Sequence, residues 1–425
     1  MSDELRDEET YLAARAEQLA ARMEGEGVSR KKLLQLVGHA LPLLTGGNPF
    51  AAAGSASRQA VSSRPIHKPL PPEWFVPFGT NAEMRWDSLA GVGYEIPNER
   101  FFVRSHTATP LIDPETWRLR VFGDGLKLRP GAGDAVEFSL RDLKRLSSKK
   151  LTAFIECAGN GRGLFAGQQG TPAPGTQWGL GGVGVAEWCG VPLSEVLERA
   201  GLTSSAVDVL PEGLDPNVVS GGVDLGKVRR PLPVDKALED VLVAYEMNGV
   251  PLPPDHGYPV RLVVPGWVGI ASIKWLGQIE VSTQPLFSPW NTTSYRMFGP
   301  DYPGDSPPLT SQPVKSALEL PRGALLPAGV RTTLTGRAWS GPAAIGRVEV
   351  SADRGATWAD ARLHGKNRAG AWVQWKFKLE PRSPGEHEIW TRATDKDGRT
   401  QPATVPFNSY GYLNSAVVRH PVVVA

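Results

Sequence analysis

Cysteine is scarce in this sequence: the 425-residue chain contains only Cys157 and Cys189. Two thiols exclude a disulfide framework and a four-thiolate zinc site, although the pair could form a single bridge. One disulfide or two buried thiols is therefore the plainest interpretation before the flanking residues are considered.

An excess of charge is also absent, since 46 Lys and Arg residues face 44 Asp and Glu residues. No dense basic stripe interleaved with aromatic residues is present, so the sequence predicts no nucleic-acid partner. Its weakly apolar run from Leu33 to Leu44 is too short, and too interrupted by His39 and Pro42, to span a bilayer. We therefore expect no membrane span in the mature chain, while a small anion needs only a local cluster of cations to bind.

Glycine, proline and aromatic residues are plentiful: 47 Gly, 38 Pro, 13 Trp and 13 Phe. The absence of a strict period excludes collagen, and the aromatic content argues against disorder. The composition indicates a folded, turn-rich protein that is long enough for two or three domains.

The first 62 residues differ from the rest of the chain. Residues 3–24 have an amphipathic pattern with charge pairs at helical spacing, which predicts a helix. The basic group Ser29–Lys32 then precedes a weakly apolar core and a small-residue tail, the layout of a twin-arginine export signal with Arg-Lys in place of Arg-Arg. We expect an exported, periplasmic protein; surface helices of a cytosolic protein are the alternative. Residues 63–80 are Pro-rich and are expected to form an extended linker.

Residues 81–300 mix helical and strand patterns. Helices are expected at Pro192–Ala200, which Gly201 ends, and around Lys236–Glu239. This mixture predicts an α+β domain. The apolar runs expected as buried strands are Leu151–Glu156, Val241–Tyr245 and Val260–Val264.

Residues 301–425 alternate apolar and polar side chains between frequent turn signals. This pattern predicts an antiparallel immunoglobulin-like β-sandwich. The expected strands include Thr332–Trp339, Gly346–Ser351, Ala371–Leu379 and Glu386–Ala393.

Four segments place reactive groups where packing alone would not require them: Phe101–His106, Glu156–Arg162, Asp255–Lys274 and Thr293–Arg296. Each has an innocent explanation when taken singly. A cysteine at the end of an apolar strand is more often a small buried hydrophobe than a ligand, and lone arginines and lysines usually lie at a solvated surface. Only the combination of the four segments points to a site.

Together these segments resemble the sulfite oxidase family of molybdopterin enzymes. The resemblance is most specific across Tyr245–Lys274, and the Cys-Ala-Gly-Asn segment at Cys157 and the Arg-x-His segment at Arg104 lie where the family has them. The segment Val348–Trp358 resembles the family's C-terminal dimerisation domain. The resemblance implies a sulfite-oxidase-type molybdopterin domain over 81–300, followed by a β-sandwich dimerisation domain over 301–425.

The resemblance also implies a molybdenum–molybdopterin cofactor, with the thiolate of Cys157 as the protein's ligand to the metal. Soft sulfur ligands suit such a metal, and coordination holds the thiol deprotonated. Cys189 is expected to be a packing residue. The implied catalytic pocket contains Arg104, Arg162, Trp178 and Tyr295. The implied cofactor-binding residues are Phe102, Val103, Arg104, Ser105, His106, Asp215, His256, Arg261, Ser272, Ile273 and Lys274.

Two departures from the family bear on the reaction. Animal sulfite oxidases carry a haem domain ahead of the molybdenum domain, and the first 60 residues here are too short for one, so a separate c-type cytochrome is the expected electron acceptor. The family usually has a further pocket arginine in a strand that here lies at Ala371–Lys376, where Trp or Gln takes its place. A pocket with fewer cations, beside the glycine-rich segment Gly163–Gly175, favours a bulkier substrate than free sulfite.

The expected function is therefore oxidation of sulfane sulfur on a carrier protein, as in the sulfane dehydrogenase branch of the family. A homodimer, or a heterotetramer with the cytochrome, is the expected assembly. A periplasmic sulfite dehydrogenase is the near alternative. An exported binding protein without metal is the distant one, and an absence of molybdenum in the native protein would favour it.

Overall fold

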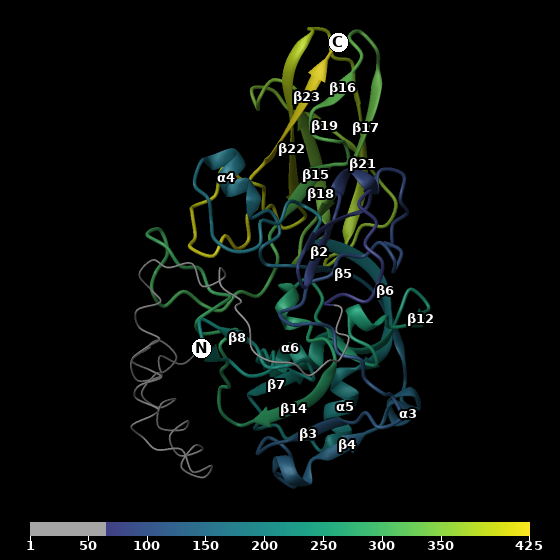
Figure 1. Cartoon of the computed structure of the whole chain (residues 1–425), viewed down its shortest axis with the longest axis vertical. Helices are drawn as coiled ribbons and strands as arrows, with labels where there is room; N and C mark the ends of the chain where they lie inside the picture. Colours follow the sequence, from purple (N-terminus) through teal and green to yellow (C-terminus); the bar gives the residue numbers. More distant parts are fainter. Residues whose placement is uncertain (1–64) are drawn as a thin grey trace.

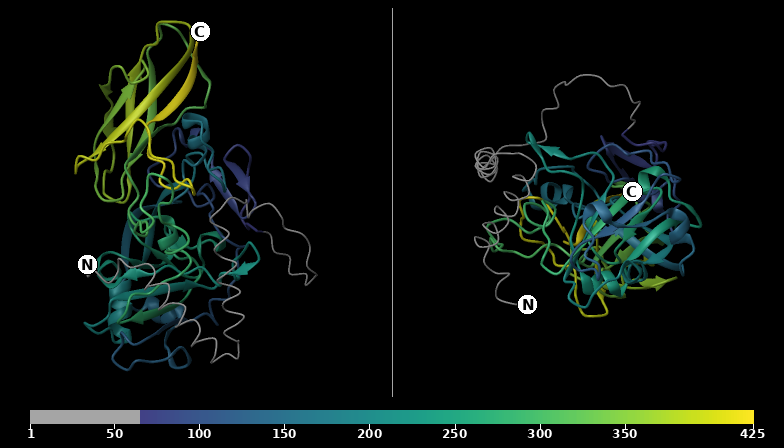
Figure 2. Two further views of the ribbon diagram at one scale, coloured as in Figure 1. Left: turned by 90° about the vertical axis from the view of Figure 1, so that its left-hand side faces the viewer. Right: turned by 90° about the horizontal axis from the view of Figure 1, so that it is seen from below.

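The computed structural model describes residues 65–425 and has two lobes stacked along its long axis (Figures 1 and 2). The lower lobe is α+β, and the upper lobe is a β-sandwich that carries the C-terminus. The helix expected over residues 3–24 and the export signal lie outside the described residues. Within residues 65–425, no helix is both long and apolar enough to cross a membrane.

The α+β lobe contains two main sheets. One has the strand order β10-β7-β14-β3-β4, and the other has the order β12-β11-β6-β5 with β13 paired to β11. Small ribbons β1-β2 and β8-β9 complete the lobe. The strands are β1 (Phe75–Phe78), β2 (Asn81–Met84), β3 (Leu119–Phe122), β4 (Val136–Phe138), β5 (Lys149–Glu156), β6 (Val183–Pro192), β7 (Asp208–Gly213), β8 (Val219–Ser220), β9 (Val223–Asp224), β10 (Leu232–Pro233), β11 (Leu242–Met247), β12 (Val250–Pro251), β13 (Arg261–Val263) and β14 (Leu276–Ser282).

Helices in this lobe are short. The most amphipathic is α5 (Leu193–Ala200), which buries its apolar face between the sheets and ends at Gly201 in the left-handed conformation that glycine adopts readily. The other α-helices are α3 (Leu140–Lys144), α4 (Gly163–Gln169) and α6 (Val234–Glu239), and the 3-10 turns are η3 (Trp86–Leu89), η4 (Ala132–Asp134), η5 (Pro254–His256) and η6 (Gly269–Ala271).

The upper lobe is a two-sheet sandwich with the strand orders β15-β17-β21-β20 and β16-β23-β22-β18-β19. Its own apolar core lies between the sheets and includes Val348, Trp375 and Ile389. The strands are β15 (Lys315–Leu318), β16 (Ala324–Leu326), β17 (Thr332–Trp339), β18 (Ile345–Ser351), β19 (Ala359–Asp360), β20 (Arg362–His364), β21 (Trp372–Leu379), β22 (Gly385–Asp395) and β23 (Val418–Val424).

The expected α+β fold with a terminal β-sandwich is confirmed. Helices α5 and α6, strands β5, β11 and β13, and the four expected sandwich strands all form within a few residues of their expected positions. Their apolar periodicity is strong and local, so it is visible before tertiary structure is known.

Two chain segments pack against the α+β lobe, one of them the stretch expected to be a linker. The Pro-rich segment contains β1, buries Ile66 and Phe75, and donates backbone hydrogen bonds from His67 and Lys68 to the carboxylate of Asp255. The loop between β22 and β23 returns from the sandwich to the lower lobe, where the backbone NH of Leu413 donates to the carbonyl of Ala158. Both segments therefore help to build the walls of the site.

Candidate active site

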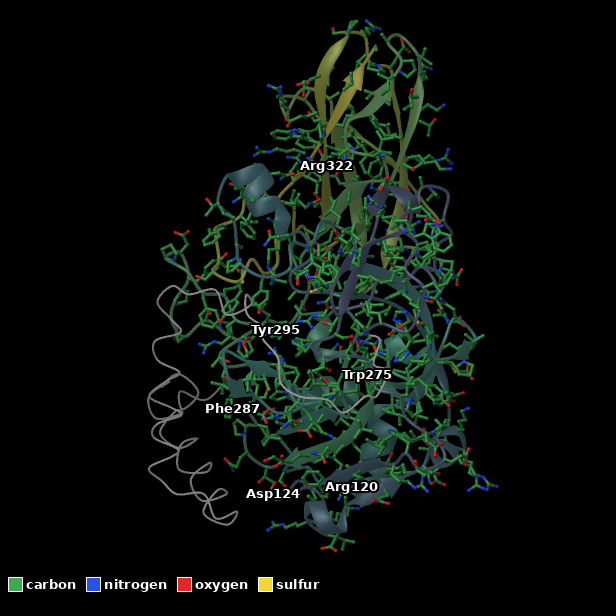
Figure 3. The ribbon with its side chains drawn as sticks, in the orientation of Figure 1. Arg120, Asp124, Trp275, Phe287, Tyr295 and Arg322 are labelled. Atoms are coloured by element: carbon green, nitrogen blue, oxygen red, sulfur yellow. The ribbon has the colours of Figure 1, made fainter. Side chains whose placement is uncertain are left out.

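A cleft of about 720 Å³, counting the open solvent at its mouth, lies in the α+β lobe. Tyr295 and Trp275, which line it, are labelled in Figure 3 near the middle of the molecule. Several segments converge on it: the end of β5, the loop between η3 and β3, the turns η5 and η6, and the segment after β14. Of the expected site residues, the cleft brings together Phe102, Arg104, Ser105, His106, Cys157, Asp215, His256, Arg261, Ser272, Ile273, Lys274 and Tyr295.

Three expected site residues do not line the cleft. Val103 is fully buried and pairs with Ala82. Trp178 is buried behind Phe102, with the ring centroids 6.3 Å apart and the planes perpendicular. Arg162 is the third. Val103 and Trp178 support the wall of the cleft from behind.

Arg162 braces the loop between β22 and β23. Its Nε donates to the carbonyl of Tyr410 at 2.8 Å, and a terminal nitrogen donates to the carbonyl of Thr176 at 2.9 Å. The segment stays close because Gly411 has no side chain: a Cβ there would lie 2.7 Å from Cγ of Arg162. The guanidinium therefore holds the residues that pack on Tyr295.

Cys157 directly follows β5, at the point where the strand enters the cleft. Its backbone NH donates to the carbonyl of Gly182 and its own carbonyl accepts from the NH of Asn160, both at 2.9 Å. Both cysteines are free thiols, so the disulfide interpretation is wrong. Cys189 lies on β6 outside the lining of the cleft, and burial raises the pKa of its thiol.

Arg104 is the cation nearest to the reactive thiol. It hydrogen bonds to Cys157, and its terminal nitrogen lies 3.3 Å from the hydroxyl of Tyr295. Burial alone would lower the pKa of Arg104, but Tyr295 and Cys157 outweigh it and raise the pKa above its usual value. A permanent positive charge therefore lies beside the thiol, where it attracts an anion.

His106 is held as the neutral imidazole. Its Nε2 lies 2.9 Å from a terminal nitrogen of Arg104 and 3.3 Å from Nε1 of Trp290, and both of these nitrogens can only donate. Nε2 is therefore the acceptor, and the proton is on Nδ1. Burial first, and then Arg104 and Lys274, lower the pKa of His106 well below its usual value.

Two further cations line the cleft, the half-buried Lys274 and the buried Arg261. Lys274 donates to Oγ of Ser105 at 2.6 Å and to the carbonyl of Asp255 at 2.8 Å. Arg261 donates to the carbonyls of His256 and Ser272, both at 3.0 Å, and so joins turns η5 and η6. Burial lowers the pKa of Arg261 to about 9 and, with Arg261 nearby, lowers that of Lys274 as well. Burial is the only cause of the pKa shift at Arg261, and at Lys274 the nearby Asp255 and Asp215 offset it only in part.

Two buried polar atoms in the cleft wall have no hydrogen-bond partner. One is Nε2 of His256, whose ring already bonds to the carbonyl of Asn98. The other is Oδ1 of Asp215, a carboxyl group whose pKa burial raises to about 6. Unsatisfied buried atoms are costly, so both favour a ligand that supplies partners.

The residues present fit a molybdenum–pterin group with a phosphate. Lys274 and Arg261 offer positive charge to phosphate oxygens, while His256 and Asp215 offer hydrogen bonds to a heterocycle. Cys157 offers the soft sulfur ligand for the metal.

Tyr295 sits over the thiol end of the cleft. Its backbone has a φ of 57°, a conformation that residues other than glycine rarely adopt. The ring stacks on Tyr412, which stacks on Tyr410, with centroid separations of 5.1 and 5.4 Å. Burial raises the pKa of Tyr295, so it remains a hydroxyl that can donate a hydrogen bond.

Sequence reasoning did not single out Trp290, Tyr410 and Tyr412. The two tyrosines lie in the loop between β22 and β23, more than a hundred residues from Tyr295 along the chain, and only the return of that loop brings them to the site. The cluster of aromatic residues at 407–412 was the available signal.

The strand expected to carry a further pocket arginine is β21. Its Trp372 donates to the carbonyl of Tyr94, and Gln374 lies within hydrogen-bond distance of the carbonyl of Val92. Neither residue lines the cleft. Strand β21 therefore contributes no cation to the lining of the cleft.

Comparisons with known proteins agree with this geometry. The model of the oxidoreductase molybdopterin binding domain matches residues 106–290, and that of the Mo-co oxidoreductase dimerisation domain matches residues 311–424. Mouse mitochondrial sulfite oxidase is 36% identical over 84% of this chain, which spans 63% of the mouse protein. Chicken sulfite oxidase is 37% identical over 86% of this chain and 80% of its own length.

A solved structure is also similar: the sulfane dehydrogenase SoxCD from Paracoccus pantotrophus, with a TM-score of 0.70 and 27% identity. The match covers 89% of this chain and 96% of that one. The fold and the matched domains define a molybdopterin-binding oxidoreductase. The chain belongs to the sulfite oxidase family, as the sequence motifs predicted.

Proposed function

We propose that this protein is a molybdenum-dependent dehydrogenase that oxidises an anionic sulfur compound at the Cys157 end of the cleft. The observation that carries the proposal is the contact of Arg104 with both Cys157 and Tyr295. A fixed cation beside a metal-binding thiol attracts an anion and places it within reach of the metal.

When bound, the molybdenum–pterin group supplies oxygen-atom transfer and takes up the electrons of the sulfur atom. The protein's part is to bind and orient. Cys157 holds the metal, while Lys274, Arg261, His256 and Asp215 hold the pterin and its phosphate. Ser105, Ser272, Ile273 and Phe102 complete the walls of the cleft.

Arg104 and Tyr295 prepare the substrate site. Arg104 binds the oxyanion or terminal sulfur, and the hydroxyl of Tyr295 donates a hydrogen bond to an oxygen atom at the reacting centre. His106 keeps its neutral form and orients the guanidinium of Arg104 through Nε2. Trp178 acts indirectly, because it packs behind Phe102. Arg162 also acts indirectly, through the tyrosines of the loop between β22 and β23.

Within this reaction class, we favour sulfane sulfur on a carrier protein as the substrate, a c-type cytochrome as the electron acceptor and the periplasm as the location. The similarity to SoxCD over most of both chains supports this choice. The dimerisation domain supports assembly as a homodimer, or as a heterotetramer with the cytochrome.

Oxidation of free sulfite is the second candidate. The identity to the mouse and chicken sulfite oxidases is higher than the identity to SoxCD. Both candidates use the same metal, thiol and arginine.

Electron counting with c-type cytochrome as the acceptor separates the two candidates. Sulfane sulfur taken to the sulfonate level incorporates three water oxygens, and therefore releases three times as many electrons as sulfite oxidised to sulfate.

The purified native protein would be supplied with either sulfite or a carrier protein bearing a cysteine persulfide. Slow turnover of sulfite with a high KM, and rapid turnover of the persulfide, would support sulfane oxidation. A low KM for sulfite and no turnover of the persulfide would assign the protein as a sulfite dehydrogenase.

A further inference from the structure

We propose that Lys315 and Trp339 of the β-sandwich are positioning residues for the thiol of Cys157 and act through the buried carboxylate of Glu156. The inference rests on the proposed function, because it concerns a metal held by that thiol. It gives the sandwich a second task beside dimerisation: the sandwich fixes the turn that presents the metal ligand.

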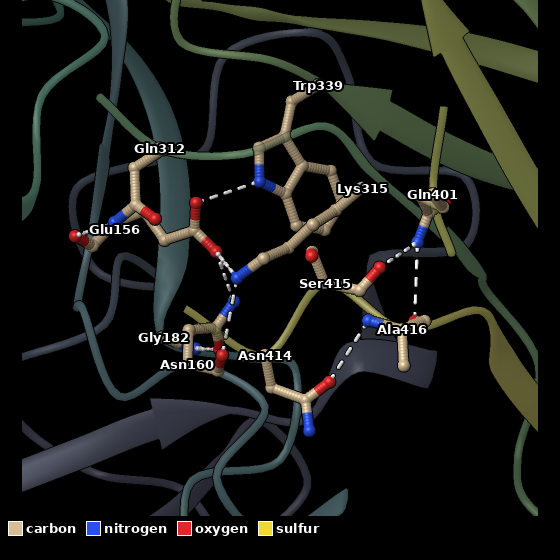
Figure 4. Close-up of polar contacts among 10 residues, drawn as sticks. All are labelled: Glu156, Asn160, Gly182, Gln312, Lys315, Trp339, Gln401, Asn414, Ser415 and Ala416. Atoms are coloured by element: carbon tan, nitrogen blue, oxygen red, sulfur yellow. Dashed lines mark hydrogen bonds and ion pairs between the residues drawn. The ribbon is translucent and has the colours of Figure 1, made fainter. Parts of the chain in front are cut away.

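Glu156 is the last residue of β5 and is completely buried. Its Oε1 accepts hydrogen bonds from Nζ of Lys315 at 2.8 Å and from Nδ2 of Asn160 at 2.9 Å (Figure 4). Its Oε2 accepts from Nε1 of Trp339 at 2.9 Å. Lys315 begins β15 and Trp339 ends β17, so both partners of the carboxylate from outside the lower lobe belong to the sandwich.

Asn160 transmits this arrangement to Cys157. The backbone NH of Asn160 donates to the carbonyl of Cys157 at 2.9 Å, and its Oδ1 accepts from the NH of Gly182 at 2.9 Å. Gly182 in turn accepts from the NH of Cys157. Lys315 reaches the same turn directly, since its Nζ lies 3.3 Å from the carbonyl of Asn160. Displacement of Lys315 therefore releases both ends of the turn that carries the thiol.

The ion pair also sets the local charge. Consecutive residues at a strand end point to opposite sides, so Glu156 faces the sandwich while Cys157 faces the cleft. An uncompensated carboxylate here would oppose a thiolate on the next residue and an anionic substrate beyond it. Lys315 is only 3% exposed and cancels that charge. The pair thus adjusts the electrostatics of the metal ligand without contacting the substrate.

The chain offers a matched control. Arg337 and Glu319 form a second fully buried ion pair in the sandwich. Arg337 also donates to the carbonyls of Val92 and Gly93 in the lower lobe. This pair joins the two lobes as the Lys315 pair does, but it makes no contact with the Cys157 turn.

The test compares Lys315→Met, Lys315→Arg, Trp339→Phe and Arg337→Met in the full-length protein loaded with cofactor. For each variant, the molybdenum content, the reduction potential of the metal, the paramagnetic resonance spectrum of the half-reduced metal and kcat would be measured. We expect Lys315→Met to shift the potential and the spectrum and to lower kcat by about 10–100-fold, a typical effect of removing a partner that orients a ligand. Trp339→Phe should shift the potential and the spectrum to a smaller degree. Lys315→Arg keeps the positive charge and should retain most of the wild-type values.

Arg337→Met should lower Tm at least as much as Lys315→Met and leave the spectrum and potential unchanged. If Lys315→Met does not fold, Trp339→Phe carries the test through the same two readouts, with Lys315→Arg as the conservative control. Normal metal content with a wild-type spectrum and potential in Lys315→Met, or in Trp339→Phe where Lys315→Met does not fold, would overturn the inference alone. An absence of molybdenum from the wild-type protein would overturn the proposed function and this inference with it.

Discussion

The ring of Tyr412 lies parallel to the ring of Tyr295, with centroids 5.1 Å apart and an angle of 12° between the planes. Tyr412 comes from the loop that returns from the sandwich, and Tyr410 continues the stack to a position where 37% of its surface is exposed. Three aromatic rings therefore connect the thiol end of the cleft to the surface. The loop that returns from the sandwich therefore contributes directly to the position of the Tyr295 side chain.

Replacement of Tyr412 should reduce catalysis through Tyr295. We expect Tyr412→Leu to lower kcat/KM by up to about 10-fold, because a stacked aromatic pair contributes about 0.5–1.5 kcal/mol beyond its buried area. Tyr412→Phe keeps the stack and should stay closer to wild type. Steady-state kinetics of both variants check this, and equal losses in the two would show that stacking is not what positions Tyr295.

The two arginines near Cys157 should differ in effect. Arg104→Met removes the cation that lines the cleft and should lower kcat/KM by about 10²–10³-fold, the usual effect of removing a donor at a developing charge. Arg162→Met should lower it by no more than about 10-fold, because its bonds go to Tyr410 and Thr176 rather than into the cleft. Losses of equal size would place Arg162 at the substrate.

His256 should make stability depend on pH. Burial first, and then Lys68, Lys274 and Arg261, lower its pKa, so the folded protein keeps it neutral where the unfolded chain, with a pKa near 6.5, takes up a proton. The stability this contributes is present above about pH 6.5 and is lost as the pH falls below it, by up to about 1.4 kcal/mol per pH unit.

Urea unfolding midpoints of wild type and His256→Asn measure this contribution. The difference between the two proteins should shrink or reverse from about pH 7.5 to about pH 5.5. Asp215, whose pKa burial raises to about 6, acts in the opposite direction, but its effect cancels in the comparison. Midpoints that run parallel across this range would mean that His256 is not held neutral.

The sequence predicted the fold class and many of the strands well, for a physical reason. Strands such as β5 and β17 have apolar patterns that depend on neighbouring residues only, so their positions follow from the chain itself. Cys157, Arg104 and Lys274 lie in short motifs whose residue types suit a metal, an anion and a phosphate.

Long-range contacts were harder to predict from the sequence. Tyr412 and Lys315 reach the lower lobe only because the sandwich packs against it, and no local pattern encodes that contact.

The central claim is that Cys157 binds molybdenum. Metal analysis of the native protein, together with the sulfur-to-metal absorption band, tests it directly in wild type, Cys157→Ser and Cys189→Ala. We predict stoichiometric molybdenum and an intense band in wild type and in Cys189→Ala, and loss of the band and of activity in Cys157→Ser even where pterin is retained. A wild-type protein without molybdenum, or an unchanged band in Cys157→Ser, would contradict the claim.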